Sequence, residues 1–311
     1  MSPRGRALAF ALGLLLLAAV PPLAAVFNQP VYLDLVRRIM IFAIAAASLN
    51  LILGYGGMVS FGHAAYLGIG GYAVGVLAHY GVTDGFLQWG LAIGASALLA
   101  LVIGAVSIRT SGVYFIMITL AFTQMLYYLG ISIEEFGADD GMRLTVKSRF
   151  PGIDLADANT FYYLVLVILV LVLCLIYRIV NSRFGMAIRA ARSNEARTRA
   201  IGLAPYPYRL AAFVISGAVC GLAGALLVNH TAYLTPEFMN WTRSGELMFM
   251  VILGGMGSVV GPVLGAFALL VLEDLLSGWT AHWQIILGPL LVLSVLFFRR
   301  GLAGLVLRKN D

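Results

Sequence analysis

Charged residues are scarce in this chain, and this scarcity limits the class of protein. Only 11% of the 311 residues are Asp, Glu, Lys or Arg, whereas soluble domains carry about 25%. Hydrophobic residues make up 61%, or about 190 residues. Because one membrane-spanning helix needs about 20 apolar residues, this supply suffices for about nine or ten spans. The composition excludes a soluble enzyme, a secreted disulfide scaffold and a disordered chain.

Cysteine and catalytic motifs are also sparse. The two cysteines, Cys174 and Cys220, each lie inside an apolar run, so they are interpreted as packing residues rather than a metal site or a disulfide framework. The chain lacks the Gly-x-x-x-x-Gly-Lys-Ser/Thr loop that binds nucleotide phosphates, and it shows no nucleophile–base set. We therefore expect a non-catalytic chain that binds no cofactor, with any use of ATP confined to partner subunits.

Apolar runs predict an all-α integral membrane protein, with one transmembrane domain over residues 1–311. The ten predicted spans are 7–27, 39–54, 58–80, 86–107, 112–133, 161–180, 210–229, 246–259, 262–279 and 282–298. The first run follows Arg4 and Arg6, as in a signal peptide. Its Pro21-Pro22 pair and the lack of a clear cleavage site favour an uncleaved helix.

Basic residues predict the orientation. With ten spans both termini share one side, which then carries 14 of the 20 Lys and Arg residues and leaves 6 on the other. Because basic loops stay in the cytoplasm, both termini are predicted to be cytoplasmic. Arg37 and Arg38 do not fit: either they lie on an outer loop beside Asp34, or the first two spans are misdrawn. The net charge of +6 reflects topology rather than affinity for nucleic acid.

Two loops are long enough to carry function. Residues 134–160 are predicted to lie outside, and residues 181–209, with six arginines, inside. Within the inner loop, Ser193 or Asn194 can cap a short helix, Glu195 lies in its first turn and Gly202 can end it. Such a short helix needs a packing partner. It either docks into a cytosolic protein, or the loop merely sets topology and contacts lipid headgroups.

Glycine interrupts two of the predicted spans. Seven of the 18 residues from Gly54 to Gly71 are glycine, and a second run reads Gly254-Gly255-Met256-Gly257-Ser258. Irregular backbone inside a membrane is tolerated where protein or a water-filled cavity covers it, so the breaks indicate a translocation path. Close helix packing is the alternative. The candidate path residues are Gly54, Gly56, Gly57, Ser60, His63, Gly254, Gly255 and Ser258. His63 also fits a hydrogen-bonded packing role.

These stretches carry a family resemblance. The run from Leu53 to Ala65, the run from Gly254 to Gly265 and the acidic outer loop resemble the permease subunits of branched-chain amino-acid ABC importers, of the LivM type. The inner loop is similar to the family's coupling loop, although Arg197 replaces an alanine and Gly202 lies one residue further on than in the general ABC-permease motif. Urea and short-amide importers share these motifs.

The resemblance implies a type II importer fold in the bacterial inner membrane, surrounded by lipid. It also implies a second homologous permease, two cytosolic ATPases and an external solute-binding protein, with ATPase coupling through Asn194, Glu195, Ala196 and Gly202.

The rival class is a stand-alone secondary transporter, which needs a buried charge near mid-span. Only Asn50, Gln124 and His63 are deep polar candidates, and Glu273-Asp274 lie near an outer span end, where solvation is expected.

Overall fold

The structure is a computed structural model that describes residues 3–26, 30–152, 154–280, 282–297 and 301–306. Its longer helices are α1 (Pro3–Val26), α2 (Pro30–Asn50), α3 (His63–His79), α4 (Gly85–Ser107), α5 (Val113–Ile131), α6 (Ala158–Val180), α7 (Arg183–Ser193), α9 (Pro205–Thr231), α10 (Trp241–Gly254), α11 (Gly261–Trp279) and α12 (Trp283–Phe297). The shorter elements are η1 (Leu51–Tyr55), η2 (Glu134–Phe136), β1 (Met142–Arg143), α8 (Glu195–Ala200), β2 (Tyr233–Leu234), η3 (Pro236–Met239) and α13 (Gly301–Val306).

Six of the described helical segments are long and apolar enough to cross a membrane. They are Val31–Tyr55, Gly85–Ser107, Val113–Ile131, Ala158–Val180, Pro205–Thr231 and Gly261–Trp279. Two shorter apolar stretches, Gly13–Ala24 in α1 and Trp283–Leu293 in α12, accompany them. The described chain is thus mostly helical, with one short two-stranded pairing, and is consistent with the predicted integral membrane protein.

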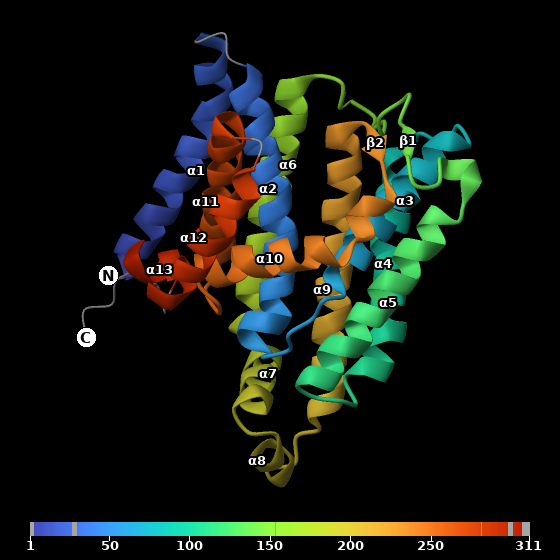
Figure 1. Cartoon of the computed structure of the whole chain (residues 1–311). Helices are drawn as coiled ribbons and strands as arrows, with labels where there is room; N and C mark the ends of the chain where they lie inside the picture. The colour runs from blue at the N-terminus through green and yellow to red at the C-terminus, as the bar shows by residue number, and fades with distance from the viewer. Residues whose placement is uncertain (1–2, 27–29, 153, 281, 298–300, 307–311) are drawn as a thin grey trace.

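The predicted boundaries need correction at both glycine breaks. In place of the span 58–80, α3 begins only at His63 and has 17 residues. In place of the span 246–259, α10 has 14 residues, ends at Gly254 and runs across the direction of α2 in Figure 1. Both helices are shorter than the about 20 residues that a full crossing needs. Glycine accounts for the end of α10, because Gly255 and Gly257 adopt positive φ values. Helix α3 keeps four glycines in its interior and begins late because residues 58–62 are not helical.

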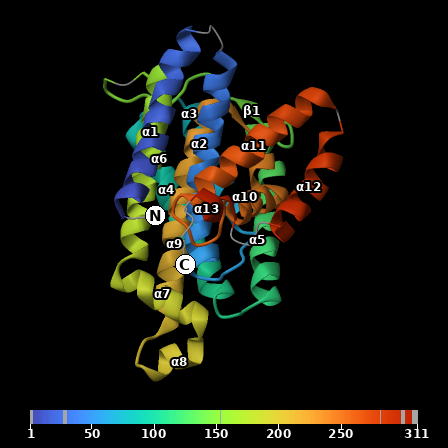
Figure 2. The same cartoon turned by 90° about the vertical axis from the view of Figure 1, so that its left-hand side faces the viewer.

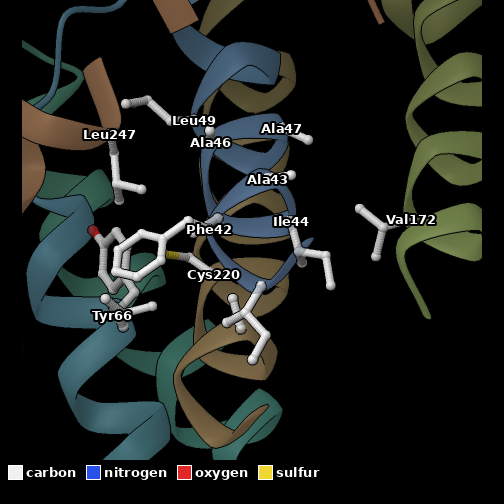
Figure 3. Packing of buried hydrophobic residues seen from close by; sticks show 14 of the residues in the cluster. Phe42, Ala43, Ile44, Ala46, Ala47, Leu49, Tyr66, Val172, Cys220 and Leu247 are labelled. Carbon is white, nitrogen blue, oxygen red and sulfur yellow. The ribbon is translucent and has the colours of Figure 1, made fainter. Parts of the chain in front are cut away.

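Helices α2 and α9 form the centre of the molecule. Within their most apolar windows, 83% and 72% of the residues are buried, against 39% or less in the other four segments. Small residues of α2, such as Ala43 and Ala46, let neighbouring helices approach closely. Figure 3 shows Tyr66 of α3, Cys220 of α9 and Leu247 of α10 beside them. Cys220 is buried there, as expected of a packing residue, whereas Cys174 is exposed on α6.

The two long loops lie at opposite ends of the helices. Helices α7 and α8 form one end, and the segment that leads to β1 forms the other (Figures 1 and 2). There β1 pairs antiparallel with β2, with Met142 opposite Leu234 and Arg143 opposite Tyr233. The chain thus separates 181–209 from 134–160, as the alternation of predicted spans requires.

Arg37 and Arg38 lie inside a helix, so the first two spans were misdrawn. Helix α2 begins at Pro30 rather than at residue 39, because the charges near its start are paired. Arg37 bonds to Asp34 and lies over the Phe161 ring, with 5.6 Å from its guanidinium carbon to the ring centroid. Arg38 Nη2 lies 3.2 Å from Glu273 Oε1 of α11. Glu273 is therefore paired and partly buried rather than simply solvated.

The start of α6 gives a testable pH effect. The Asp157 carboxylate accepts hydrogen bonds from the Thr160 hydroxyl (2.6 Å) and backbone N–H (2.8 Å). These bonds hold the pKa of Asp157 below its ordinary value of 3.8. A depressed folded-state pKa means that the cap stabilises fully above pH 3.8 and weakens as the pH falls through the folded-state value.

We therefore expect Asp157→Ala to lower the apparent melting temperature at pH 6, and this deficit to shrink as the pH falls below about 4. Asp157→Asn is the matched control, because asparagine caps helices about as well but does not titrate. Its advantage over Asp157→Ala should stay constant with pH. Thermal unfolding in detergent from pH 3 to pH 7 measures both, and a deficit of Asp157→Ala that stays constant with pH would contradict the assignment.

Candidate functional site

The two glycine breaks lie in contact, joined by the side chain of Asn50. This residue ends α2, and its amide nitrogen donates to the Ser258 carbonyl oxygen at 2.8 Å. Its side-chain oxygen accepts from the Gly257 backbone N–H at 3.0 Å. Asn50 is 1% exposed, so these bonds form away from water. We name residues 50–57 and 254–261 together the glycine junction.

At two positions of the first break, neighbouring segments approach so closely that only glycine fits. A β-carbon at Gly54 would lie 2.5 Å from the Gly257 nitrogen and would overlap the Asn50 side-chain oxygen. Gly57 has a φ of +69°, and a β-carbon there would lie 2.8 Å from Arg192 Cγ of α7. Glycine is favoured at such positions because other residues pay a steric cost. Gly54 and Gly57 therefore allow the first break, the second break and α7 to lie in contact.

Between α2 and α3 the backbone leaves the helical path, and side-chain hydroxyls bond to the backbone groups of Phe61 and Ala64. The Phe61 carbonyl oxygen accepts from Thr123 Oγ1 at 3.0 Å and from Ser244 Oγ at 2.7 Å. The Phe61 N–H donates to Thr119 Oγ1 at 3.2 Å, and the Ala64 N–H donates to Ser244 Oγ at 2.8 Å. We call Thr119, Thr123 and Ser244 the hydroxyl cradle. All three residues are fully buried.

Ser60 and His63 are also fully buried. Ser60 Oγ accepts from the Gly62 N–H at 3.1 Å. His63 Nε2 lies 2.8 Å from Ser216 Oγ, and the Ser216 hydroxyl donates to the Ser48 carbonyl oxygen at 2.5 Å. Because Ser216 has a single proton, His63 Nε2 must donate to it. His63 thus ties α3 to α9 and α2, and the structure supports its packing role.

At the second break, backbone N–H groups also form hydrogen bonds with nearby residues. Gly254 ends α10 and is buried, and Gly255 follows it with its N–H donating to the Val251 carbonyl oxygen at 3.0 Å. Ser258 Oγ accepts from the Gly261 N–H at 3.2 Å, where α11 begins. Ser258 is partly exposed, and Gly57 is exposed. The other candidate path residues are buried in this conformation: Gly54, Gly56, Ser60, His63, Gly254 and Gly255.

The inner loop contains two helices rather than the single short one predicted. Ser193 ends α7, and Asn194 caps α8 by accepting from the Arg197 N–H at 2.9 Å. Gly202 has a φ of +87°, as expected for the residue that ends the segment. Ala196 is exposed on α8.

Glu195 fastens α8 to the membrane helices. Its carboxylate accepts from Arg199 at 2.5 Å and from Arg209 of α9 at 2.6 Å. Arg209 also donates to the Ala191 carbonyl oxygen of α7 at 3.0 Å. The loop is therefore a folded unit with a defined position on α9. Its first helix, α7, contacts the glycine junction.

A cleft of about 930 Å³ lies at the other end of the molecule, in the outer loop. Its lining includes Lys147, Arg149 and Asp154. Burial, together with the nearby Arg37, lowers the pKa of Lys147. The sequence analysis did not identify this cleft, because it forms only when the loop folds against α9. Among the described residues, no three His, Cys, Asp or Glu side chains come together to hold a metal ion.

The hydroxyl cradle makes a testable contribution to stability. Replacing Ser244 with alanine leaves the buried Ala64 N–H without its acceptor, which costs about 1–3 kcal/mol. Ser277→Ala is the matched control, because Ser277 is exposed and bonds only within α11, so its effect should stay within about 0.5 kcal/mol. Apparent melting temperatures of the purified variants in detergent measure the difference, and equal values for the two variants would show that the cradle is dispensable.

Comparison with known proteins adds independent evidence. Residues 31–295 match the family described as "Branched-chain amino acid transport system / permease component". The chain is 30% identical over 293 residues to the high-affinity branched-chain amino acid transport system permease protein LivM of Salmonella typhimurium, covering 86% of this chain and 69% of that protein.

A probable LivM of Methanocaldococcus jannaschii is 25% identical over 299 residues, with 82% of this chain and 85% of that protein covered. The autoinducer 2 import system permease protein LsrC of Yersinia pseudotuberculosis is 26% identical over 137 residues, with 42% and 39% covered. No solved structure shows a significant match.

Proposed function

The chain belongs to the family of branched-chain amino acid transport permeases, and we propose that it is the membrane-spanning subunit of an ATP-driven importer for leucine, isoleucine and valine. The observation that carries this proposal is the family match over residues 31–295, with LivM proteins among the relatives that cover most of the chain. The six long apolar segments and the paired glycine breaks agree with a permease.

For the fold, we propose ten membrane-embedded segments in a type II importer arrangement. Eight are α1, α2, α4, α5, α6, α9, α11 and α12, and two are the short helices α3 and α10. The short helices flank the glycine junction, where irregular backbone is covered by protein. This is the arrangement expected of a transport path built from discontinuous helices.

The basic residues support the orientation. The end with α7 and α8 carries six loop arginines, and we place it in the cytoplasm of a bacterium with both termini on that side of the inner membrane. The opposite end, with β1, β2 and the 930 Å³ cleft, then faces an external solute-binding protein.

We assign ATP hydrolysis to two separate cytosolic ATPase subunits and propose that α8 docks onto one of them. A second homologous permease completes the pair. Glu195 supports this role because its ion pair with Arg209 ties α8 to α9, while its ion pair with Arg199 lies within α8, so a movement of α8 is transmitted to α9. Asn194 and Gly202 bound the helix, and Ala196 lies on its exposed surface.

Importers of urea or short amides are the alternative within the same family. LsrC, a permease named for autoinducer 2 import, is similar over 137 residues, so a partial similarity does not by itself define the solute. A stand-alone proton-driven transporter is disfavoured, because Asn50 and His63, two of its three deep polar candidates, are engaged by backbone atoms and by Ser216.

The substrate assignment is tested by reconstituting the chain in proteoliposomes with the permease, ATPases and binding protein encoded beside it. We expect the binding protein loaded with leucine, isoleucine or valine to stimulate ATP hydrolysis and uptake. Stimulation by urea or a short amide instead would reject the amino-acid substrate. Uptake by the chain alone, driven by a proton gradient, would reject the ATP-driven class.

The docking role predicts the effect of a charge reversal. Glu195→Lys places a third cation beside Arg199 and Arg209, so α8 should detach from α9 and substrate-stimulated ATP hydrolysis should fall about tenfold, within the usual range of coupling energies. Adding Arg209→Glu should restore part of the stimulation. Asp274→Lys, an exposed reversal on α11, is the control and should leave it unchanged. Full stimulation in Glu195→Lys would exclude the role.

A further inference from the structure

The inner loop is hydrogen-bonded to the glycine junction through the side chain of Arg192. Arg192, on the last turn of α7, donates through Nη1 to the carbonyl oxygen of Gly54. This carbonyl belongs to η1, which continues α2 to Tyr55, so the guanidinium bonds near a helix end where carbonyl groups carry partial negative charge. The bond joins two positions that are 138 residues apart in the chain.

The other arginines of the loop are engaged elsewhere or free. Arg189 donates to the carbonyl oxygens of Gly185 and Val180, and Arg199 and Arg209 bind Glu195. Arg189 also lies within electrostatic reach of Tyr55 in the junction, but over the described length of the loop Arg192 is the arginine that donates a hydrogen bond to it. Its stem also packs against Gly57, where a side chain would collide with it.

From Gly54 the contact continues directly to the second break. Gly54 lies against the Gly257 backbone nitrogen, and Asn50 bonds to both Gly257 and Ser258 from the preceding helical turn. Asn50 makes these two bonds with one rigid amide group, so the breaks keep a fixed relative position as long as both bonds hold. A displacement of α7 that pulls on the Gly54 carbonyl must therefore move both breaks together or detach Arg192.

We propose that Arg192 and Asn50 are the positioning residues that transmit movement of the inner loop to the two glycine breaks. Arg192 links α7 to the first break, and Asn50 links the first break to the second. The inference rests on the proposed function, in which partner ATPases move this loop. It adds the two side chains through which that movement reaches the path.

The first test measures coupling in the chain reconstituted with its second permease, ATPases and binding protein, with leucine as the transported probe. Arg192→Ala should hydrolyse ATP at close to the parent rate, while leucine uptake per ATP falls about tenfold. Arg192→Lys should recover part of the uptake, because it keeps a donor at this position. Arg178→Ala is the control, since Arg178 is exposed at the end of α6 and its loss removes the same charge. Parent-like coupling in Arg192→Ala would overturn the inference.

The second test does not depend on the identity of the solute. Ser258→Cys, in a Cys174→Ala background, reports on the second break through its rate of maleimide labelling; the remaining Cys220 is buried. Trapping the complex with ATP and vanadate should change this rate in the parent chain. The change should disappear in both Arg192→Ala and Asn50→Ala, while labelling without nucleotide and copurification of the ATPases show that each variant is folded.

The outcomes separate the two hypotheses. A nucleotide-dependent change that persists in both variants, or its absence from the parent, would overturn the linkage whatever the solute. A parent complex that shows the nucleotide-dependent labelling but takes up no leucine, isoleucine or valine would instead reject the proposed substrate and leave the linkage supported.

Discussion

Backbone groups that leave a helix inside a membrane must find hydrogen-bond partners within the protein, and the centre of this structure is organised around that requirement. Residues 56–62 do not continue α2, and the backbone N–H and carbonyl oxygen of Phe61 bond to buried hydroxyls from α5 and α10. The second break receives the amide of Asn50. These side chains hold two irregular segments in one conformation, and α2 and α9 surround them with small apolar residues.

The requirement also explains how the inner loop, at one end of the molecule, is connected to the glycine junction. A helix that ended in the usual way would bond its last carbonyl groups to water or to a local cap. Here the Gly54 carbonyl bonds to Arg192 of α7. On the other side of the loop, Arg209 bonds to both Glu195 and Ala191. The loop is thus held at two points, one on α9 and one on the glycine junction.

Local signals in the sequence were sufficient for much of this organisation. The Asn194 cap and the positive φ of Gly202 follow from residue type, and the i, i+4 spacing of Glu195 and Arg199 favours the pair that forms. Hydropathy misplaced the start of α2, because Asp34, Arg37 and Arg38 look like a loop until their partners are known. It also extended the span of α3 back through residues 58–62, which are not helical, and the span of α10 through the glycines that end it.

The tertiary contacts could not be predicted for a different reason. Asn50 and Arg192 bond to backbone atoms, and a backbone acceptor leaves no mark in the sequence of the partner segment. Thr119, Thr123 and Ser244 look like ordinary small polar residues in apolar helices, since helical bonding to the preceding turn would satisfy each hydroxyl equally well. The similarity of the two glycine runs suggested that they are related, but it did not indicate which residues of one run contact which residues of the other.

The contacts also reconcile the two interpretations of the glycines. A translocation path and close helix packing are opposing interpretations, because a tightly packed segment leaves no opening for a solute. In the structure Gly54 is packed against Gly257, and Ser60 and His63 are buried, whereas Gly57 and Gly257 are exposed. A closed contact between glycine backbones has few side-chain atoms to rearrange, and a few directional bonds hold it. Such a contact can separate by breaking those bonds, without repacking the surrounding core. Under the proposed function, close packing and a solute path are therefore compatible, because the same glycines would separate when a movement of the inner loop pulls on the bonds that hold them.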